Sequence, residues 1–281
     1  MVLLVRPAKV GWSVIFLRSV SRAKTAARDD LEFPFSVPVV RSLPALEFHN
    51  AVTFFVGENG SGKSTLLEGL AAATGLPAIG AEHPSTDETL GGQRRLAKAL
   101  HLTWAKRTHK GFFLRAEDFF GFAKSLSKMR IQMMQRMAEI DAEYAARSAY
   151  ARGLASGPAV ASLADMERRY GVNLDANSHG QSFFKLFHSR FVPGGLYLLD
   201  EPEAPLSPQS QLGLIAMIKE MVAQDAQFII ATHSPILLAF PEARIMSFDE
   251  PPIREVAYED LEHVSLTRDF LRDPDRFLRR L

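Results

Sequence analysis

The sequence predicts an α/β fold built on a parallel or mixed β-sheet with a helical insertion. The first observation is an apolar run at 52–56 that leads through a glycine-rich loop into a helical pattern. The second is an alternation of short apolar strands and helices from 196 to 248. The third is helical spacing between about 118 and 150. Strands that alternate with helices are typical of parallel sheets, because each parallel connection must cross over the sheet.

The overall composition is that of a soluble globular protein. The chain has 281 residues, enough for one large domain, with 47% hydrophobic and 23% charged residues. A net charge of +1 neither demands nor excludes a nucleic-acid or membrane partner. The absence of cysteine excludes disulfides and cysteine metal sites and fits a reducing cytoplasm, where we expect the protein to reside.

The beginning of the chain predicts a strand region with an extension. Arg6, Lys9 and Arg18 interrupt its mildly apolar character, which leaves a signal peptide or amphipathic anchor as the minor alternative. No run of 18 apolar residues occurs, so we expect no integral membrane segment. A strand is expected at 14–20 and a polar loop at 21–30.

Three prolines mark the stretch from 33 to 46, where apolar residues alternate. Pro34, Pro38 and Pro44 cannot donate a ladder hydrogen bond, so the pattern predicts edge strands. The segment 77–92 is rich in Gly, Pro, Ser and Thr without periodicity, and it predicts an irregular surface segment.

A phosphate-binding loop follows the apolar strand at 52–56. Residues 57–65 read GENGSGKST, which matches G-x-x-x-x-G-K-[ST]. The glycines let backbone N–H groups converge on an anion at the start of the next helix. Lys63 can then reach the β- and γ-phosphates, and the Ser64 hydroxyl can bind Mg²⁺. The strand and helix around the loop argue against a chance match. The residues predicted to bind the nucleotide here are Asn59, Gly60, Ser61, Gly62, Lys63, Ser64 and Thr65.

The middle of the chain predicts a short strand at 111–115 and then helix from 119 to 150. Apolar side chains recur there at steps of three and four: Leu126, Met129, Met133, Met137, Ile140 and Tyr144. We interpret this stripe as the buried face of a helical subdomain, too short for a long coiled-coil arm. An adaptable partner surface is the alternative. The stretch 151–164, rich in Gly, Ala and Ser, predicts a break.

An acidic pair follows the strand predicted at 196–199. A strand buried on both faces delivers Asp200 to its carboxyl end, where ligands bind in such sheets. Asp200 can hold the Mg²⁺ water shell, and Glu201 is placed to polarise an attacking water. An acidic pair after a strand is weak alone and strong beside a phosphate-binding loop. A helix is expected at 209–223.

A histidine follows the next strand, predicted at 228–231. His233 in the sequence ATHSP could contact the γ-phosphate and orient water. A lone histidine is more often structural, but the position at another strand end, after the acidic pair, favours the functional role. A short helix at 236–240 and a strand at 244–248 complete the alternation.

A second anion-binding element lies between the helical insertion and the acidic strand. Residues 177–182 read NSHGQS and precede a helix-prone segment, which predicts a helix N-terminus flanked by Ser and Gly. One chain has no obvious use for two phosphate cradles. Two copies facing head to tail would, because each could close over the nucleotide of the other.

The set of motifs resembles the ABC-class P-loop ATPases. Their order here is phosphate loop (57–64), signature (178–182), Walker B (196–201), D-loop (204–207) and switch histidine (233). The signature keeps Ser178, Gly180 and Gln181 and has Asn177 and His179 where the family has Leu and Gly. The Ser-His-Gly sequence in the signature motif, together with the sequences DEPE and THSP, is most similar to small soluble predicted ATPases related to RecF, SMC and OLD proteins.

The resemblance implies an ABC-type ATPase head and a shared active site. It assigns ATP and Mg²⁺ as cofactors, Glu201 as catalytic base and His233 as γ-phosphate sensor. In a homodimer, Lys63 and Ser64 of one copy would face Ser178 and Gly180 of the other. A single domain over 1–281 would comprise a nucleotide-binding core (14–75 and 191–250), a helical signature subdomain (about 118–190) and a C-terminal helical tail (251–281).

Two family positions depart from the pattern. Ser207 stands at the D-loop aspartate, and no glutamine matches the Q-loop: Gln93 lies early, in an expected loop, and 115–117 reads RAE. Phe33 and Phe35 are weak candidates for stacking on adenine.

Three functions remain open from the sequence. The first is an ATPase that drives or switches a partner process, either DNA-related or defence-related, with an unidentified protein partner. The second is an ATP-dependent dimerisation switch with little turnover. The third is the ATP-binding subunit of a transporter. Nucleic acid is a family-level expectation only, because Asp269, Asp273 and Asp275 interleave with the C-terminal arginines and predict a solvated helix.

Overall fold

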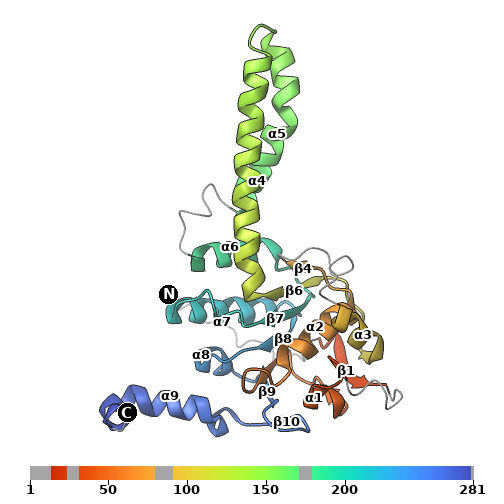
Figure 1. The fold of residues 1–281 in the computed structure, drawn as a ribbon, viewed down its shortest axis with the longest axis vertical. Helices are drawn as coiled ribbons and strands as arrows, with labels where there is room; N and C mark the ends of the chain where they lie inside the picture. The colour runs from red at the N-terminus through yellow and green to blue at the C-terminus, as the bar shows by residue number, and fades with distance from the viewer. Residues whose placement is uncertain (1–13, 24–31, 80–90, 171–178, 280–281) are drawn as a thin grey trace, which may run out of the picture.

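The computed structural model describes residues 14–23, 32–79, 91–170 and 179–279. Figure 1 shows a layered body from which one pair of helices projects. Among the described helices, none is long and apolar enough to span a lipid bilayer. The signal-peptide question and most of the polar loop expected at 21–30 fall outside the described residues.

A mostly parallel sheet forms the centre of the body, as the sequence predicts. Within the described residues it has seven strands, and every neighbouring pair is parallel except the antiparallel edge pair β10–β9. The strands in spatial order are β10 (Arg254–Glu255), β9 (Arg244–Ser247), β3 (Val52–Val56), β8 (Gln227–Ala231), β7 (Leu196–Asp200), β6 (Gly111–Arg115) and β4 (Ala78–Ile79). Parallel pairing brings the carboxyl ends of β3, β7 and β8 to one edge of the sheet.

Helices cover both faces of this sheet. Helices α6 (His179–Arg190), α7 (Pro208–Val222) and α8 (Pro235–Leu238) pack on one face through the core that contains Phe54, Tyr197 and Phe228. Helices α2 (Lys63–Thr74) and α3 (Gly91–Ala99) pack on the other through a second core. Strands β3, β7 and β8 are buried along their whole length. Burial on both faces explains why they are continuous apolar runs without alternation.

A smaller antiparallel sheet caps the second core. In the described part of the chain it orders as β2 (Leu46–Glu47), β1 (Leu17–Arg22) and β5 (Leu100–Trp104). The buried Gln227 side chain fastens it: its Oε1 accepts from the N–H groups of Phe16 and Leu17, both at 2.9 Å, and its Nε2 donates to Leu17 O at 2.9 Å.

The expectation of edge strands across 33–46 is largely wrong. Only Leu46–Glu47 pairs as a strand, and Pro38 instead begins the short helix α1 (Pro38–Arg41). Proline suits the first position of a helix, because its fixed φ is helical and the N–H it lacks would have no partner there.

A helical hairpin projects from the body at the end of β6 (Figure 1). It consists of α4 (Ala116–Glu143) and α5 (Ala149–Tyr170), and a 28-residue helix spans about 40 Å at 1.5 Å per residue. The break expected at 151–164 is wrong, because these residues lie within α5. Alanine favours helix, and packing against α4 offsets the low helix propensity of the Gly and Ser residues. The predicted stripe is buried at Ile140 but 45% exposed at Met129, so it is only partly a core face.

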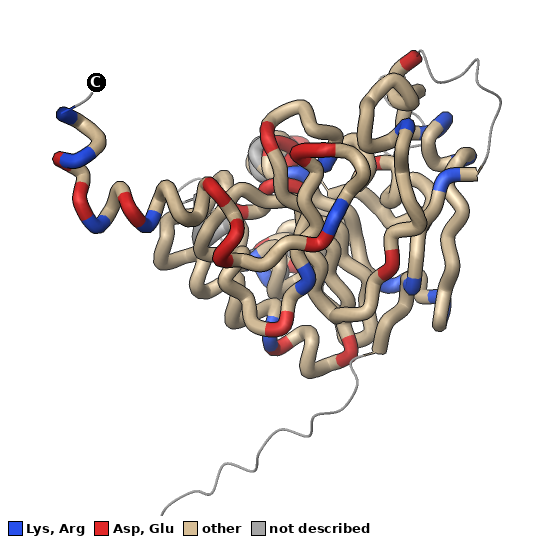
Figure 2. The backbone as a smooth tube through the Cα atoms, turned by 90° about the horizontal axis from the view of Figure 1, so that it is seen from below, with Lys and Arg blue, Asp and Glu red and all other residues tan. Residues whose placement is uncertain are grey.

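The chain ends in a short helical segment beside the sheet edge. The 3₁₀ helix η3 (Tyr258–Asp260) leads into α9 (Glu262–Arg272) and α10 (Pro274–Leu278), and Figure 2 shows basic and acidic positions mixed along this end. The expected solvated helix is confirmed by its exposure, since residues 266–276 are all exposed. Its charges form ion pairs: Arg268 Nη1 lies 2.6 Å from Glu259 Oε2, and Arg279 pairs with Asp275 at 3.9 Å.

Candidate active site

The glycine-rich loop lies between β3 and α2, as predicted. Gly57, Gly60 and Gly62 have φ of 144°, 83° and 99°, values that residues with a side chain rarely adopt. A Cβ on Gly62 would lie 2.7 Å from both Val37 Cγ1 and Val39 Cγ2, so the loop needs glycine there for space as well. The Ser61 Oγ atom is buried without a hydrogen-bond partner. The loop therefore carries donors prepared for a ligand at the α2 N-terminus.

Lys63 is 5% exposed and turns back onto its own loop. Its Nζ donates to Gly57 O at 2.5 Å and to Glu58 O at 3.0 Å. Burial lowers the pKa of Lys63, while Glu201 and Asp200 act in the opposite direction. Phosphate oxygens can replace these two carbonyl acceptors with charged ones, which makes stronger hydrogen bonds.

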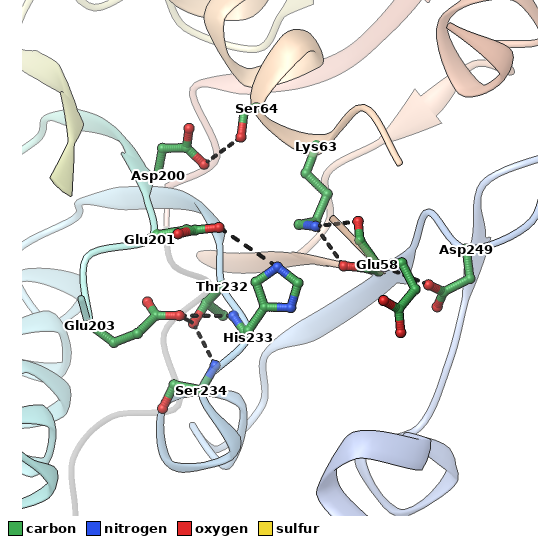
Figure 3. A network of polar contacts seen from close by, with 11 residues as sticks. Glu58, Lys63, Ser64, Asp200, Glu201, Glu203, Thr232, His233, Ser234 and Asp249 are labelled. Atoms are coloured by element: carbon green, nitrogen blue, oxygen red, sulfur yellow. Dashed lines mark hydrogen bonds and ion pairs between the residues drawn. The ribbon is translucent and has the colours of Figure 1, made fainter. Parts of the chain in front are cut away.

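A brace on the loop comes from the far end of the chain and was missed by the sequence analysis. The Glu58 N–H donates to Asp249 Oδ1 at 2.8 Å (Figure 3). The Ser247 hydroxyl donates to Asp249 Oδ2 at 2.9 Å. Asp249 follows β9, which is a neighbour of β3 in the sheet. No local pattern marks this aspartate, because its partner is 191 residues away.

Ser64 and Asp200, the two predicted Mg²⁺ ligands, lie in contact at the sheet edge. The Ser64 hydroxyl donates to Asp200 Oδ1 at 3.1 Å (Figure 3). They line a pocket of about 470 Å³ together with Glu68, Arg115, Ala116, Glu117, Glu201 and Ala204. A hydroxyl and a carboxylate are hard oxygen donors that fit Mg²⁺, which keeps several waters and needs the space that the pocket provides.

Burial raises the pKa of Asp200 to about 7, with the Ser64 hydrogen bond acting against the rise. If Asp200 is a Mg²⁺ ligand, protons compete with the metal for its carboxylate, and Mg²⁺ binding should release a proton below that pH. We expect Mg²⁺ affinity in the presence of a non-hydrolysable ATP analogue to fall up to about tenfold per pH unit below the pKa, and to level off above it. Calorimetry at several pH values measures this.

Asp200→Asn is the control for this pH dependence, because it removes the titrating group while the nucleotide phosphates still titrate. The pH dependence measured for Asp200→Asn is subtracted from that of the wild type. A wild-type Mg²⁺ affinity that shows no remaining pH dependence would contradict the expectation.

Glu201 and His233 converge on the same edge from adjacent strands. Glu201 has φ of 49°, and its N–H donates to Ala231 O at 2.9 Å. A non-glycine residue in this region is strained, and such strain is common at functional sites. Glu201 Oε1 lies 3.7 Å from His233 Nε2 (Figure 3).

His233 is prepared to interact as a neutral imidazole. Burial lowers its pKa, and the nearby Lys63 charge lowers it further. Its Nε2 has no hydrogen-bond partner. A neutral imidazole with a free Nε2 can bond a phosphate oxygen or a water.

The position expected for the Q-loop holds an arginine in a polar cluster. Arg115, at the end of β6, forms an ion pair with Glu68 of α2. Gln93 donates through Nε2 to Glu68 Oε2 at 2.7 Å. Gln93 lies in helix α3, so its placement in a loop is wrong; glycines at 91 and 92 suggested a turn that the packing of α3 on α2 overrides.

The two aromatic candidates for adenine stacking differ in exposure. Phe35 is 6% exposed within the second core, and the Arg22 guanidinium lies 4.8 Å from its ring centroid, so its faces are not open to adenine. Phe33 is 49% exposed and stays a candidate.

The signature motif is placed only in part. Ser178 lies outside the described residues, as does Asn177. Gly180 and Gln181 belong to the first turn of α6, and the Gln181 side chain lies outside the description. Ser207, at the D-loop aspartate position, has a helix-capping role: its Oγ accepts from the Ser210 N–H at 3.2 Å.

Comparison with known proteins gives two sequence findings. A family model described as an AAA domain matches residues 39–89, which include the phosphate-binding loop. The cobalt import ATP-binding protein CbiO of Salmonella typhimurium is 25% identical over 259 residues, which cover 87% of this chain and 88% of that protein. CbiO of Salmonella typhi is 26% identical over similar shares.

Solved structures that align with the chain include ATPase cassettes and an SMC head. A nucleotide-free ATP-binding cassette from an ABC transporter aligns with 93% of this chain and 96% of its own, at 17% identity and a TM-score of 0.45. The Smc head domain of Pyrococcus furiosus, with its extended coiled coil, aligns with 92% of this chain and all of its own, at 11% identity and a TM-score of 0.42.

The loop, the Ser64–Asp200 contact and the sheet order define a P-loop nucleoside triphosphatase. The order of motifs and the sequence relatives, which are ATP-binding proteins of cobalt import, support a P-loop ATPase of the ABC class.

Proposed function

We propose that this protein binds Mg²⁺ and ATP, closes head to tail as a homodimer around two nucleotides, and hydrolyses ATP to drive or switch a partner process. The observation that carries the proposal is the convergence of Lys63, the Ser64–Asp200 pair and the Glu201–His233 pair at one sheet edge. Binding, metal and hydrolytic groups thus share one site.

The residues support hydrolysis by an activated water. Lys63 exchanges its carbonyl partners for the β- and γ-phosphates. Glu201 accepts a proton from the water that attacks the γ-phosphorus, and His233 Nε2 binds the γ-phosphate. Ser64 and Asp200 would hold Mg²⁺, which when bound would supply positive charge beside the phosphates. In-line displacement then yields ADP and phosphate.

The remaining donors come, in this proposal, from the second copy. Ser178, Gly180 and Gln181 of one protomer would contact the nucleotide held by its partner at the α6 N-terminus. This division explains why the chain carries two anion-binding elements. The proposal includes a single ATPase domain over 1–281 divided as the sequence analysis expects, and a cytoplasmic location.

Lys63→Ala tests nucleotide binding. We expect the affinity for ATP to fall by about 10- to 100-fold, because charged hydrogen bonds contribute about 1.5–3 kcal/mol, and turnover at limiting ATP to fall with it. Fluorescent-nucleotide titration and a phosphate-release assay measure the two effects. Lys98→Ala, which removes an exposed lysine from α3, should leave both unchanged. Wild-type affinity and turnover in Lys63→Ala would refute the nucleotide site.

A second candidate is the ATP-binding subunit of a transporter. The observation that favours it is the similarity to the cobalt import proteins over 87% of the chain. Purification from membranes with an integral subunit would support it over the RecF-, SMC- and OLD-related subtype. A client that is nucleic acid should instead bind with an affinity that falls steeply with salt.

A further inference from the structure

Glu203 lies two residues after the proposed catalytic base and reaches across to the next strand. Its Oε1 accepts from the Thr232 hydroxyl at 2.6 Å and from the His233 N–H at 2.8 Å (Figure 3). Thr232 is fully buried, and its Oγ1 in turn accepts from the Ser234 N–H at 3.0 Å. One carboxylate oxygen therefore fixes the start of the segment that carries the histidine.

The turn that carries Glu203 is rigidly tied to Glu201. The Ala204 N–H donates to Glu201 O at 3.0 Å, and the Leu206 N–H donates to Glu203 O at 2.8 Å. Glu203 thus joins the turn of the base to the segment of the histidine. These contacts fix the backbone on both sides of the 3.7 Å separation between Glu201 Oε1 and His233 Nε2.

The environment of Glu203 makes these two bonds hard to replace with water. Its second oxygen, Oε2, is buried without a hydrogen-bond partner, and burial raises the pKa of its carboxyl group. Glu203 lines an apolar groove of about 920 Å³ between α7, α8 and α9, with Leu212, Ile215 and Ile236. An acceptor lost from this place takes away the partner of the His233 amide and of the fully buried Thr232 hydroxyl.

We propose that Glu203 is a positioning residue for His233, which it holds at the distance from Glu201 that hydrolysis requires. The proposal rests on the proposed function, because it assigns Glu203 a role through the γ-phosphate sensor. Glutamine at 203 keeps an oxygen that can accept both hydrogen bonds, whereas alanine removes the acceptor. Thr232→Val removes one of the two donors and keeps the amide bond.

The kinetic test is a double-mutant cycle with His233. Glu203→Ala should lower kcat by about 10- to 100-fold, the loss expected from an ångström-scale displacement of a catalytic group, with ATP affinity changed less than about twofold. Glu203→Gln should recover most of kcat, and Thr232→Val should show a smaller loss in the same direction. In a His233→Ala background, Glu203→Ala should add almost nothing, because the group it positions is gone.

A second measurement needs no turnover. Hydrogen exchange should show the His233 amide protected in the wild type and in Glu203→Gln, and exposed to exchange in Glu203→Ala, while the amide of Ile229 within β8 stays protected in all three. If Glu203→Ala does not fold, Thr232→Val in the same cycle carries the test.

The outcomes separate the two proposals. If the kcat losses from Glu203→Ala and His233→Ala multiply in the double variant, or if the exchange rate of the His233 amide is unchanged in Glu203→Ala, the positioning role is overturned. The proposed ATPase function is unaffected by either result. A wild-type protein without turnover overturns the proposed function, and the exchange data then decide whether Glu203 still fixes the segment.

Discussion

Replacing Glu201 with glutamine is expected to lower ATP turnover by about 10²–10⁴-fold, the usual contribution of a positioned general base. Glutamine keeps the size of the side chain but cannot accept the proton of the attacking water. Glu201 is 47% exposed at the pocket rim, and it is not a partner in the hydrogen bonds given above for Lys63 and Ser64, so nucleotide affinity should stay near wild type. Single-turnover phosphate release and nucleotide titration measure the two quantities separately.

The same variant should also reveal the dimer. If closure precedes hydrolysis, Glu201→Gln with ATP and Mg²⁺ should accumulate at twice the monomer mass in light scattering, and return to monomer mass with ADP. Glu220→Gln, an exposed position on α7, is the matched control and should behave as wild type. Unimpaired turnover in Glu201→Gln would show that Glu201 is not the catalytic base. A protein that stays monomeric with both ATP and ADP would refute the homodimer and also the dimerisation-switch alternative.

Mixing two inactive variants should restore activity if the active site is shared between protomers. Lys63→Ala disables the phosphate loop, and Ser178→Arg obstructs the signature element. In a mixed head-to-tail dimer, one of the two sites collects both defects and the other collects none. With random pairing, half of the dimers are mixed, so an equal mixture should regain about a quarter of wild-type turnover if the sites act independently. A phosphate-release assay on the mixture and on each variant alone measures this.

A double variant is the control for complementation. Lys63→Ala mixed with Lys63→Ala/Ser178→Arg contains no intact phosphate loop and should stay inactive. If mass measurement shows mixed dimers in the first mixture but turnover does not return, the catalytic groups do not come from two chains, and the role given to Ser178, Gly180 and Gln181 is wrong.

Features that depend on interactions within a few residues are predicted correctly from the sequence, whereas features that depend on distant partners are not. The phosphate loop, the strand at 111–115 and the alternation after 196 are encoded within a few residues, and all appear where predicted. For longer stretches without a strong local signal, the predicted secondary structure is wrong. Residues 151–164 look like a break in composition, yet they form helix because α4 packs along α5. Pro38 reads as a strand edge, yet it begins a helix.

The candidate site divides in the same way. Lys63, Ser64, Asp200, Glu201 and His233 could be identified because each sits in a short motif at a strand end. Asp249 and Glu203 could not, because their roles depend on partners brought near by the sheet order. Asp249 meets Glu58 across 191 residues, and Glu203 meets His233 across 30.

By itself, the sequence determined that this chain is an α/β protein with a phosphate-binding loop, and with an acidic pair and a histidine at the ends of two strands, because backbone conformation and burial of single strands are local properties. Only the tertiary structure decided how these groups are held: a Glu203 carboxylate that fixes the histidine segment, an Asp249 that braces the loop, and an Arg115–Glu68 pair where a glutamine was sought. Those contacts follow from which strands are neighbours in the sheet, and that order is set by the packing of both cores rather than by any single segment.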